Sequence, residues 1–539
     1  MSIRTNKMKA ISVLLKELMT ARSKFQRKRD ASFDGKLEKL RLDLNKIKDV
    51  FVRVKKNEEE LIDTLAEVHA HLRKLDRKKL DEDMDFICKR IRDSAHKLLP
   101  MDAFDDSYKE EDHKGNQIFH SSQELQQPHQ KIWSLEDYLR LDHLSKGCLF
   151  SLLIFPDNTV IRKSNAINLW IGEGLIVDKE NKTTKEWGED VIDNLLKCRV
   201  IVRYGNEKCP LIKKFRILPN IRRHLKSYTN EYVDRLEYNL EKSRFQKTRL
   251  NRLKLEQNRV ILGDWHFDYS IHTIFNVGAS YLNFRPQWVK QFPNLKVLQL
   301  GCWQDSPLHH IEVGSEEFLK ELRNLTHLKY LSLRGISNIF ELPSSIVELE
   351  RLLVLDLKAC HNLETLPNDI SSMKSLTHLI LSQCCLLEEM PKGIEKLTNL
   401  QVLKGFVIST PRKTPCRISD LVNLKKLRQL SIHIGSEAVI RDREFESLEG
   451  FLALKCLKIS WSGSDPRYGN IFFILPPNLT KLHLECFPGK IFRECMFDTR
   501  LLEQQMELNI TGGKLESMEA DIQWEFVDIL RLKYLKPKP

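Results

Sequence analysis

Histidine and cysteine are the residues of this chain best able to hold a metal or attack a substrate, and neither occurs at a spacing that builds such a site. Seventeen histidines and twelve cysteines are scattered through the 539 residues. No His-Glu-x-x-His, Gly-x-Ser-x-Gly, Gly-x-Gly-x-x-Gly or paired Cys-x-x-Cys motif occurs. The adjacent pair His309-His310 is isolated and is interpreted as surface. We therefore expect no catalytic residue and no metal site.

A phosphate-binding loop is also missing from the sequence. Such a loop needs glycines that turn backbone N–H groups toward the phosphates, followed by a lysine and a magnesium-binding hydroxyl. The pairs Gly35-Lys36, Gly489-Lys490 and Gly513-Lys514 are followed by Leu, Ile and Leu, and none has the upstream glycine. The sequence therefore predicts a protein that is not an enzyme and has no cofactor.

The elements that could position a binding site come from a leucine repeat. Leu-x-x-Leu-x-Leu recurs from about residue 271 onward, with a period of roughly 24 to 27 residues over most of the run and one longer interval of about 33. Leu400 and Leu403 with Gly405 form a damaged copy. One such repeat cannot bury its own apolar edge, so stacked repeats form a solenoid with a continuous core. The first and second strand leucines of the clear copies are Leu298/Leu300, Leu331/Leu333, Leu355/Leu357, Leu379/Leu381, Leu430/Ile432, Leu457/Ile459, Leu482/Leu484 and, degenerately, Leu530/Leu532.

The repeat register predicts which side chains face a partner. Because successive side chains of a strand point to opposite faces, Leu355 faces the core and Asp356 the concave side. The concave row is largely polar, with Trp303, Tyr330 and Trp461 nearby, which suits a polypeptide partner better than a small apolar ligand. The candidate protein-binding residues are Gln299, Ser332, Arg334, Asp356, Lys358, Ile380, Lys404, Ser431, His433, Lys458, His483 and Glu485.

Five segments follow from the composition and hydrophobic periodicity. We expect a helical, coiled-coil-like bundle over residues 1–100, a polar linker over 101–132 and a winged-helix domain over 133–228. A basic helical connector over 229–265 and the solenoid over 266–539 complete the chain. The expected fold class is therefore multidomain, α + α/β.

Short elements define the winged-helix domain. Helices are expected at 141–153, 161–171 and 187–198, followed by strands at 200–202 and 211–212. Cys360 and Cys384, three residues after a strand leucine, are expected to cap the turning backbone and to be structural rather than reactive.

The charge is uneven and leaves a second function open. The formal net charge is +13, with an excess of Lys and Arg in the first hundred residues and between Arg199 and Arg259. Such an excess attracts nucleic acid or an anionic membrane surface, although it is more often a solvated helix face. A basic nucleic-acid- or membrane-surface-binding protein is therefore the alternative function, with any membrane association expected to be weak.

Targeting features place the chain inside the cell. No run reaches the roughly 18 apolar residues that span a bilayer, and the N-terminus lacks the pattern of a signal peptide. We expect reduced thiols and a cytoplasmic location, with the membrane periphery and the nucleus as alternatives.

Three strings in the middle segment carry a family resemblance: LSKGCLF at 144–150, FPD at 155–157 and LWIGEGLI at 169–176. They resemble the winged-helix segment of plant disease-resistance proteins, the coiled-coil NLR receptors. That family combines an N-terminal helical bundle, a nucleotide-binding switch, a winged helix and leucine-rich repeats. The order bundle, winged helix, repeats is similar across nearly the whole chain.

Departures from the family pattern concern the switch. Only residues 101–132 stand where the family has its nucleotide-binding and first helical subdomains. The family's Met-His-Asp motif would fall at Ile217–Pro219, where neither His nor Asp is present. The acidic Glu-Asp-Val-Ile-Asp motif has at most a faint echo at Asp83–Ile87. These departures predict a truncated member without an ATP-driven switch.

The resemblance also implies a function. It makes the winged helix a packing module rather than a DNA reader, and residues 164–168 of its second helix lack a cluster of Arg and Lys. The expected protein is an adaptor, decoy or regulator in plant defence. It would bind a protein through the repeats and another helical bundle through its N-terminus. A decayed receptor fragment is the remaining interpretation.

Overall fold

The computed structural model describes residues 140–535 with short gaps, and a few helical positions before residue 140. The chain divides into two compact units, one of residues 1–141 with 198–200 and one of residues 142–197 with 201–539. The gaps after residue 140 are 180–181, 205–211, 231–246, 249–251, 264–270, 305–310, 385, 388, 409–415, 436–437, 441–442, 463–467, 469–470, 493–496, 499–501 and 519–525.

The predicted bundle over 1–100 and linker over 101–132 lie almost wholly outside the described residues and stay predictions. The few positions described in the bundle are helical, and Phe86 among them is exposed. The buried ones are Leu14, Leu18, Leu37, Leu40, Leu44 and Ile87.

The winged-helix domain has the three predicted helices and two predicted hairpin strands in the expected order, but residues 161–162 form a strand before the second helix, and a further helix, α9, follows the hairpin. Its helices have local stop and start signals: the Asp142 carboxylate accepts a hydrogen bond from the Ser145 N–H at 2.6 Å, and Gly174 ends a helix in the left-handed region. The second hairpin strand lies beyond the predicted 211–212, because Phe215 and Ile217 supply the inward alternation. The elements are α6 (His143–Ser151), η2 (Leu152–Ile154), β1 (Ile161–Arg162), α7 (Lys163–Glu173), α8 (Thr184–Lys197), β2 (Ile201–Arg203), β3 (Lys214–Ile217) and α9 (Pro219–Asn230), with sheet order β1-β3-β2.

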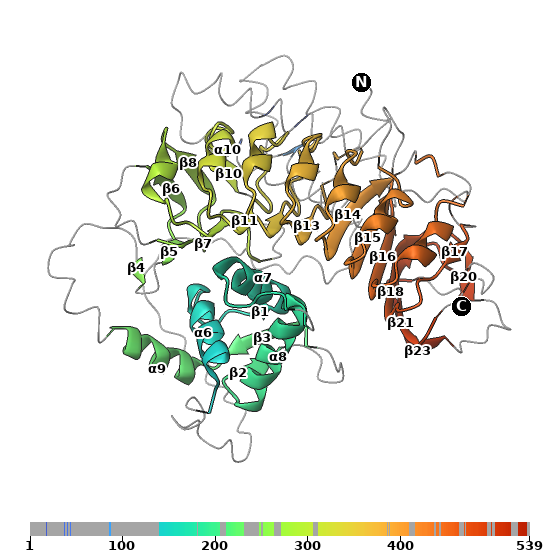
Figure 1. Cartoon of the computed structure of the whole chain (residues 1–539), viewed down its shortest axis with the longest axis horizontal. Coiled ribbons are helices and arrows are strands. Elements are labelled where there is room, and N and C mark those ends of the chain that lie inside the picture. The colour runs from blue at the N-terminus through green and yellow to red at the C-terminus, as the bar shows by residue number, and fades with distance from the viewer. Residues whose placement is uncertain are drawn as a thin grey trace. The chain divides into compact units, whose positions relative to one another are not determined.

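The repeats form one sheet, with thirteen strands among the described residues. Apart from the antiparallel β4, the strands are parallel and lie side by side in sequence order (Figure 1). They are β4 (Lys247–Thr248), β5 (Arg252–Leu255), β7 (Thr273–Asn276), β9 (Val297–Gln299), β11 (Tyr330–Ser332), β12 (Val354–Asp356), β13 (His378–Ile380), β14 (Val402–Ile408), β15 (Gln429–Ile434), β16 (Cys456–Trp461), β18 (Lys481–Phe487), β21 (Met506–Gly513) and β23 (Val527–Lys533).

Short helices and strands return the chain from one sheet strand to the next. The helices are η4 (Trp288–Gln291), α10 (Phe318–Glu321), η5 (Leu322–Asn324), η6 (Ser344–Glu348), η7 (Ile370–Ser372), η8 (Ile394–Lys396), η9 (Asp420–Asn423) and η10 (Glu446–Gly450). The additional strands are β6 (Arg259–Leu262), β8 (Tyr281–Phe284), β10 (Glu312–Val313), β17 (Phe473–Ile474), β19 (Ile491–Phe492), β20 (Phe497–Asp498) and β22 (Ser517–Met518).

The leucine ladder confirms the predicted solenoid. Leu298, Leu331, Leu355 and Leu379 lie directly opposite one another on neighbouring strands, and all four are buried. They belong to one continuous core that extends from β5 to the residues beside β23. Burial of this ladder is the main source of stability, because each repeat shares its apolar edge with its neighbours.

The predicted cysteine caps are also confirmed. The Cys360 thiol donates to the Leu333 carbonyl at 3.1 Å, and the Cys384 thiol donates to the Leu357 carbonyl at 3.1 Å. Both side chains are buried. Burial raises the pKa of the Cys360 thiol, so this sulfur stays protonated and unreactive.

The damaged copy at Leu403 is a repeat with one inserted residue. The register of β14 against β15 shifts between Lys404 and Phe406, and Phe406 pairs with Ile432 in the place of the second leucine. Gly405 takes up the insertion at a φ of 87°. A Cβ on it would lie 2.5 Å from the Leu381 carbonyl carbon. Glycine is therefore required at this bulge.

Substituting this glycine should weaken the solenoid. We expect Gly405→Ala to lower the free energy of unfolding by about 1–3 kcal/mol, since it combines a left-handed backbone with a clash against the neighbouring strand. Gly147→Ala is the matched control, because its Cβ would come no closer than 3.6 Å to Leu175 Cδ2 and alanine favours helix α6. Thermal melts followed by circular dichroism should move in opposite directions, and a Gly405→Ala melt at or above wild type would contradict the bulge.

Residues 229–265 differ from the prediction. The basic helical connector is wrong for 252–262, which form β5 and β6 with Leu253, Leu255, Val260 and Leu262 buried. The buried apolar residues recur at every second position, as in a strand, but the charged residues between them made the segment resemble a basic helix. The solenoid therefore begins by Arg252, and β21, with Leu508 opposite Leu482, is a further repeat strand that the leucine search missed.

Candidate functional site

The first repeats pack against helix α7 of the winged-helix domain. This helix contacts β9, β11 and β12. A Cβ on Gly172 would lie 2.5 Å from Tyr330 Cβ and 2.8 Å from Val297 Cγ2, so a glycine allows this close approach. The Asn165 amide donates to the Trp303 carbonyl at 2.6 Å. The helix that a DNA-binding protein would insert into a groove is thus used for packing, as expected.

The buried carboxylate of Glu173 links α7 to the first repeats by hydrogen bonds. The Arg252 guanidinium of β5 donates to both oxygens of Glu173, at 2.6 and 2.7 Å. The hydroxyls of Thr273 and Ser151 donate to the same carboxylate at 3.1 and 2.6 Å. Both charged side chains are under a tenth exposed. We call Glu173, Arg252, Thr273 and Ser151 the carboxylate clamp.

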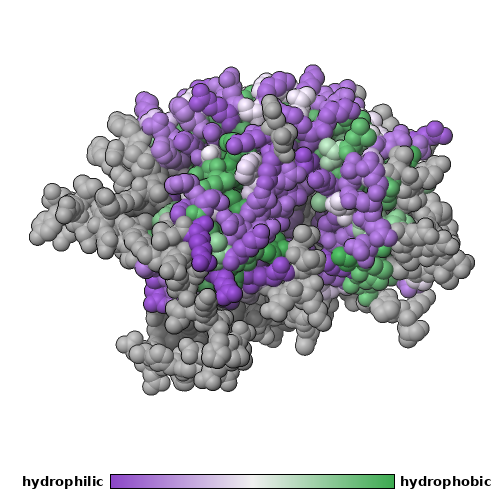
Figure 2. Space-filling view, turned by 60° about the horizontal axis from the view of Figure 1, so that its bottom comes forward, coloured by the Kyte–Doolittle hydropathy of each residue, from purple (hydrophilic) through white to green (hydrophobic). Residues whose placement is uncertain are grey.

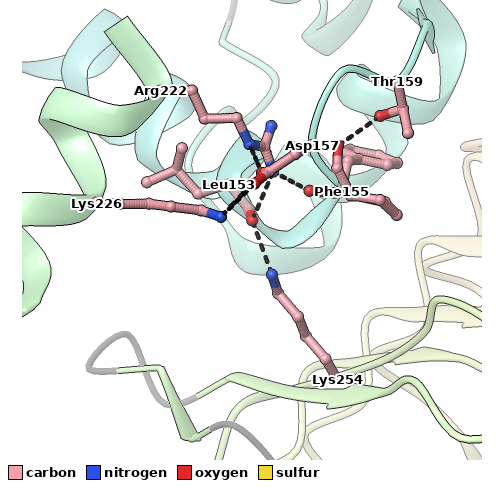
Figure 3. A network of polar contacts seen from close by, with 8 residues as sticks. Leu153, Phe155, Asp157, Thr159, Arg222, Lys226 and Lys254 are labelled. Atoms are coloured by element: carbon pink, nitrogen blue, oxygen red, sulfur yellow. Dashed lines mark hydrogen bonds and ion pairs between the residues drawn. The ribbon is translucent and has the colours of Figure 1, made fainter. Parts of the chain in front are cut away.

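A second polar network lies beside the FPD turn (Figure 3). Arg222 of α9, which is buried, donates to the Phe155 carbonyl and the Asp157 carboxylate. Lys226 pairs with the same carboxylate at 2.8 Å. Lys254 of β5 donates to the Leu153 carbonyl at 3.1 Å, and burial lowers the pKa of its ammonium to about 8. The turn is thereby linked both to α9 and to the first repeat strand.

Aromatic side chains fill the space beside this network. The Phe155 ring lies 5.1 Å from Phe275 and 5.3 Å from Trp303, centroid to centroid, in edge-to-face arrangements. Trp303 and Tyr330 are buried, as is Trp461 in a later repeat. These three aromatic residues were predicted to lie near the binding surface, but their burial removes them from it.

Further contacts join the start of α8 to the middle repeats. Gln401 donates to Asp178 at 2.5 Å, and Arg428 donates to Glu186 at 2.9 Å. Glu186 also accepts from the Thr183 N–H at 2.9 Å, closing a capping box. This backbone hydrogen bond, with help from the Arg428 guanidinium, lowers the pKa of Glu186 to about 2.

The predicted row exists as a continuous line across the sheet. The strand register pairs Gln299, Ser332, Asp356, Ile380, Lys404, Ser431, Lys458 and His483 in succession. Its two halves differ in exposure. Gln299, Ser332, Arg334, Asp356 and Ile380 are buried, whereas Lys358, Lys404, Ser431, His433, Lys458, His483 and Glu485 are partly exposed.

The partly exposed half carries a ladder of polar contacts. His433 Nδ1 lies 3.0 Å from Ser460 Oγ, and His483 Nε2 lies 3.0 Å from Thr511 Oγ1. The Lys458 ammonium pairs with Glu485 at 2.6 Å. Burial, with the Lys458 charge, lowers the pKa of His483 to about 4, so its imidazole is neutral at pH 7 and can donate or accept. We call residues 404–485 of the row the open row.

The described residues were compared with what a metal site or a reactive thiol would need. Burial raises the pKa of the Cys302 thiol to about 12. Within the described ranges, no three His, Cys, Asp or Glu side chains come together to hold a metal. No helix in those ranges has the length and apolar character to cross a bilayer. Hydrophilic side chains cover most of the described surface in Figure 2.

A leucine-rich-repeat protein with a winged-helix domain packed on its first repeats is the class that this fold defines. Residues 154–218 match the family described as disease resistance protein winged helix domain, and residues 271–522 match the leucine-rich repeat region. Together, these two matches support a plant NLR-type family of disease-resistance proteins for this chain.

Two curated relatives are similar over part of their length. Disease resistance RPP13-like protein 4 of Arabidopsis thaliana is 27% identical over 354 residues, 64% of this chain and 40% of that protein. Disease resistance protein RGA4 of Oryza sativa subsp. japonica is 25% identical over 222 residues, 39% of this chain and 20% of that protein. The chain thus matches less than half the length of either relative.

Two solved structures are similar to part of this chain. An LRR protein of Leptospira interrogans is 21% identical, covering 50% of this chain and 68% of that one, with a TM-score of 0.33. The plant peptide hormone receptor RGFR1, solved in complex with RGF2, is 17% identical, covering 55% and 53%, with a TM-score of 0.29.

The carboxylate clamp was missed by sequence reasoning. Glu173 lies in the LWIGEGLI string that carried the resemblance, but Arg252 is 79 residues away in sequence. The signal available was an acidic residue between two glycines at a helix end, which indicates close backbone approach without naming the partner.

Proposed function

We propose that this chain is a non-enzymatic plant defence protein that binds a protein partner through the open row of its repeats. The observation that carries the proposal is the division of the predicted row. Its first half is buried, and its second half keeps a run of partly exposed Ser, His, Lys and Glu side chains. Polar side chains with defined hydrogen-bond geometry give specificity to a protein interface.

The proposal includes the role of the remaining parts. The carboxylate clamp and the α7 contact support a winged helix that acts as a packing module for the repeats. The N-terminal segment would bind another helical bundle, and the chain would act as an adaptor, decoy or regulator of immune signalling. It would do so without a cofactor.

A capture experiment with matched histidine variants tests the open row. Immobilised full-length chain is incubated with extract of pathogen-challenged plant tissue, and retained proteins are quantified by mass spectrometry. His433→Ala/His483→Ala should reduce retention of the specific partner about tenfold, because it removes two polar contacts from the row. His327→Ala, at an exposed position outside the row, should retain it like wild type. Equal retention by all three proteins would reject the open row as the binding surface.

A further inference from the structure

Two lysines of the open row, Lys404 and Lys458, interact electrostatically with further lysines of the winged helix and of the repeats. Lys185 belongs to α8, Lys404 to β14 and Lys458 to β16, and Lys358 follows β12. The charges of Lys185 and Lys458 act on Lys404, and those of Lys404 and Lys458 act on Lys358. We call these four lysines the lysine cluster. Arg334, which is buried, adds a further positive charge that acts on Lys358.

Two described carboxylates, those of Asp356 and Glu485, act on these lysines. Asp356 is buried, and its Oδ1 accepts the Lys358 backbone N–H at 3.0 Å. Glu485 is taken by Lys458 at 2.6 Å. Within the described residues, the Lys404 ammonium donates no hydrogen bond and forms no ion pair. Among the described residues, the cluster therefore contains one partly buried ammonium, that of Lys404, without a hydrogen-bond or ion-pair partner.

Burial and neighbouring positive charges act together on two of these ammonium groups. Burial, together with Arg334, Lys404 and Lys458, lowers the pKa of Lys358 to about 7. Burial, with Lys185 and Lys458, also lowers the pKa of Lys404. Desolvated like charges that repel one another are typical of sites whose ligand supplies the opposite charge.

The spacing of the row favours an extended ligand over a compact one. Lys404 and Lys458 lie on one row, two strands apart, which is about 10 Å at the usual strand separation. An extended polypeptide covers that distance with about three residues. Ser431 lies between the two lysines in the register and His483 lies beyond Lys458, so hydrogen-bonding groups continue along the same line.

We propose that the lysine cluster binds an acidic polypeptide segment that carries at least two carboxylates about three residues apart. This inference rests on the proposed function, because it names the chemistry of the partner that the open row would take. One carboxylate would pair with Lys404 and Lys358, and a second would compete with Glu485 for Lys458. Neutralising the repelling ammonium groups supplies the gain on binding.

Fluorescence anisotropy with a labelled octaglutamate peptide and the full-length chain tests the inference. Lys358→Gln/Lys404→Gln should weaken binding at low salt about tenfold or more. Lys396→Gln/Lys425→Gln removes the same two charges from exposed positions of η8 and of the turn after η9, and should weaken binding less than about twofold. The melting temperature of the first variant, compared with wild type, shows whether it is folded when its binding is measured.

Each other outcome is decisive. Absence of octaglutamate binding, or equal weakening in both variants, would overturn the acidic-segment inference. So would tripolyphosphate binding that depends on Lys358 and Lys404 while the peptide does not bind, since the site would then take small anions. The capture experiment separates the two proposals. If partner retention depends on His433 and His483 but not on the lysines, the acidic-segment inference is wrong while the proposed function stands.

Discussion

Glu173→Ala should detach the winged-helix domain from the first repeats and destabilise the chain. The variant leaves the Arg252 guanidinium, which is 9% exposed, without the carboxylate that binds two of its N–H groups. Removing one partner of a buried ion pair typically costs about 3–5 kcal/mol, because the other charge stays desolvated. Thr273 and Ser151 lose an acceptor as well. Hydrogen exchange should rise in α7 and β5 together.

Matched variants separate this effect from a general loss of charge. Glu317→Ala removes an exposed carboxylate that pairs with Lys320. The Glu317 side chain is 73% exposed and the Lys320 side chain 63% exposed. Such surface pairs contribute little, so its exchange pattern should match wild type. Glu173→Ala combined with Arg252→Leu should recover part of the loss, since no buried charge is then unpaired. Wild-type exchange in Glu173→Ala would show that the clamp does not hold the two parts together.

The repeats were predictable because their signal is local and repeated. Leu355 and Leu379 mark their strands by spacing alone, and the same spacing placed Asp356 and Lys404 on one row. A period of two fixes the facing of every side chain once one leucine is assigned to the core. The row was therefore predicted residue by residue.

The accessibility of the row could not be predicted in the same way. Gln299 is buried at 2% exposure, although its register position is the expected one. Segments far apart in sequence contact its strand, such as α7 on β9, and the Tyr330 hydroxyl donates to its side-chain oxygen. Hydrophobic periodicity within one segment carries no information about a second segment that packs on its polar face.

The prediction for the first repeat strand, β5, was wrong for a different reason. Arg252 and Lys254 alternate with Leu253 and Leu255, and a basic run of this kind resembles a solvated helix. All four side chains are buried, because Glu173 and the Leu153 carbonyl accept from the two charged groups. A prediction from polarity assumes that charged side chains are exposed. It therefore missed this strand, where charged side chains are buried with specific partners.

Leu355→Ala should destabilise the middle of the solenoid by about 2–5 kcal/mol, the range for a buried leucine whose removal leaves a cavity. Leu355 is 1% exposed and lies between Leu331 and Leu379 on the two neighbouring strands. In a linear array of repeats, a weakened central interface uncouples the two sides. The urea transition followed by tryptophan fluorescence should therefore shift to lower denaturant and broaden.

Leu530→Ala is the matched control, because it makes the same substitution at the same ladder position. Leu530 lies opposite Leu508 on β23, the last strand of the sheet, and is 40% exposed. Little apolar area leaves water at this position, so the loss should stay below about 1 kcal/mol. If burial stabilises the ladder, Leu355→Ala must lower the free energy of unfolding more than Leu530→Ala does, although the two leucines share one register. Equal shifts of the urea midpoint would mean that position in the repeat, and not burial, sets the stability.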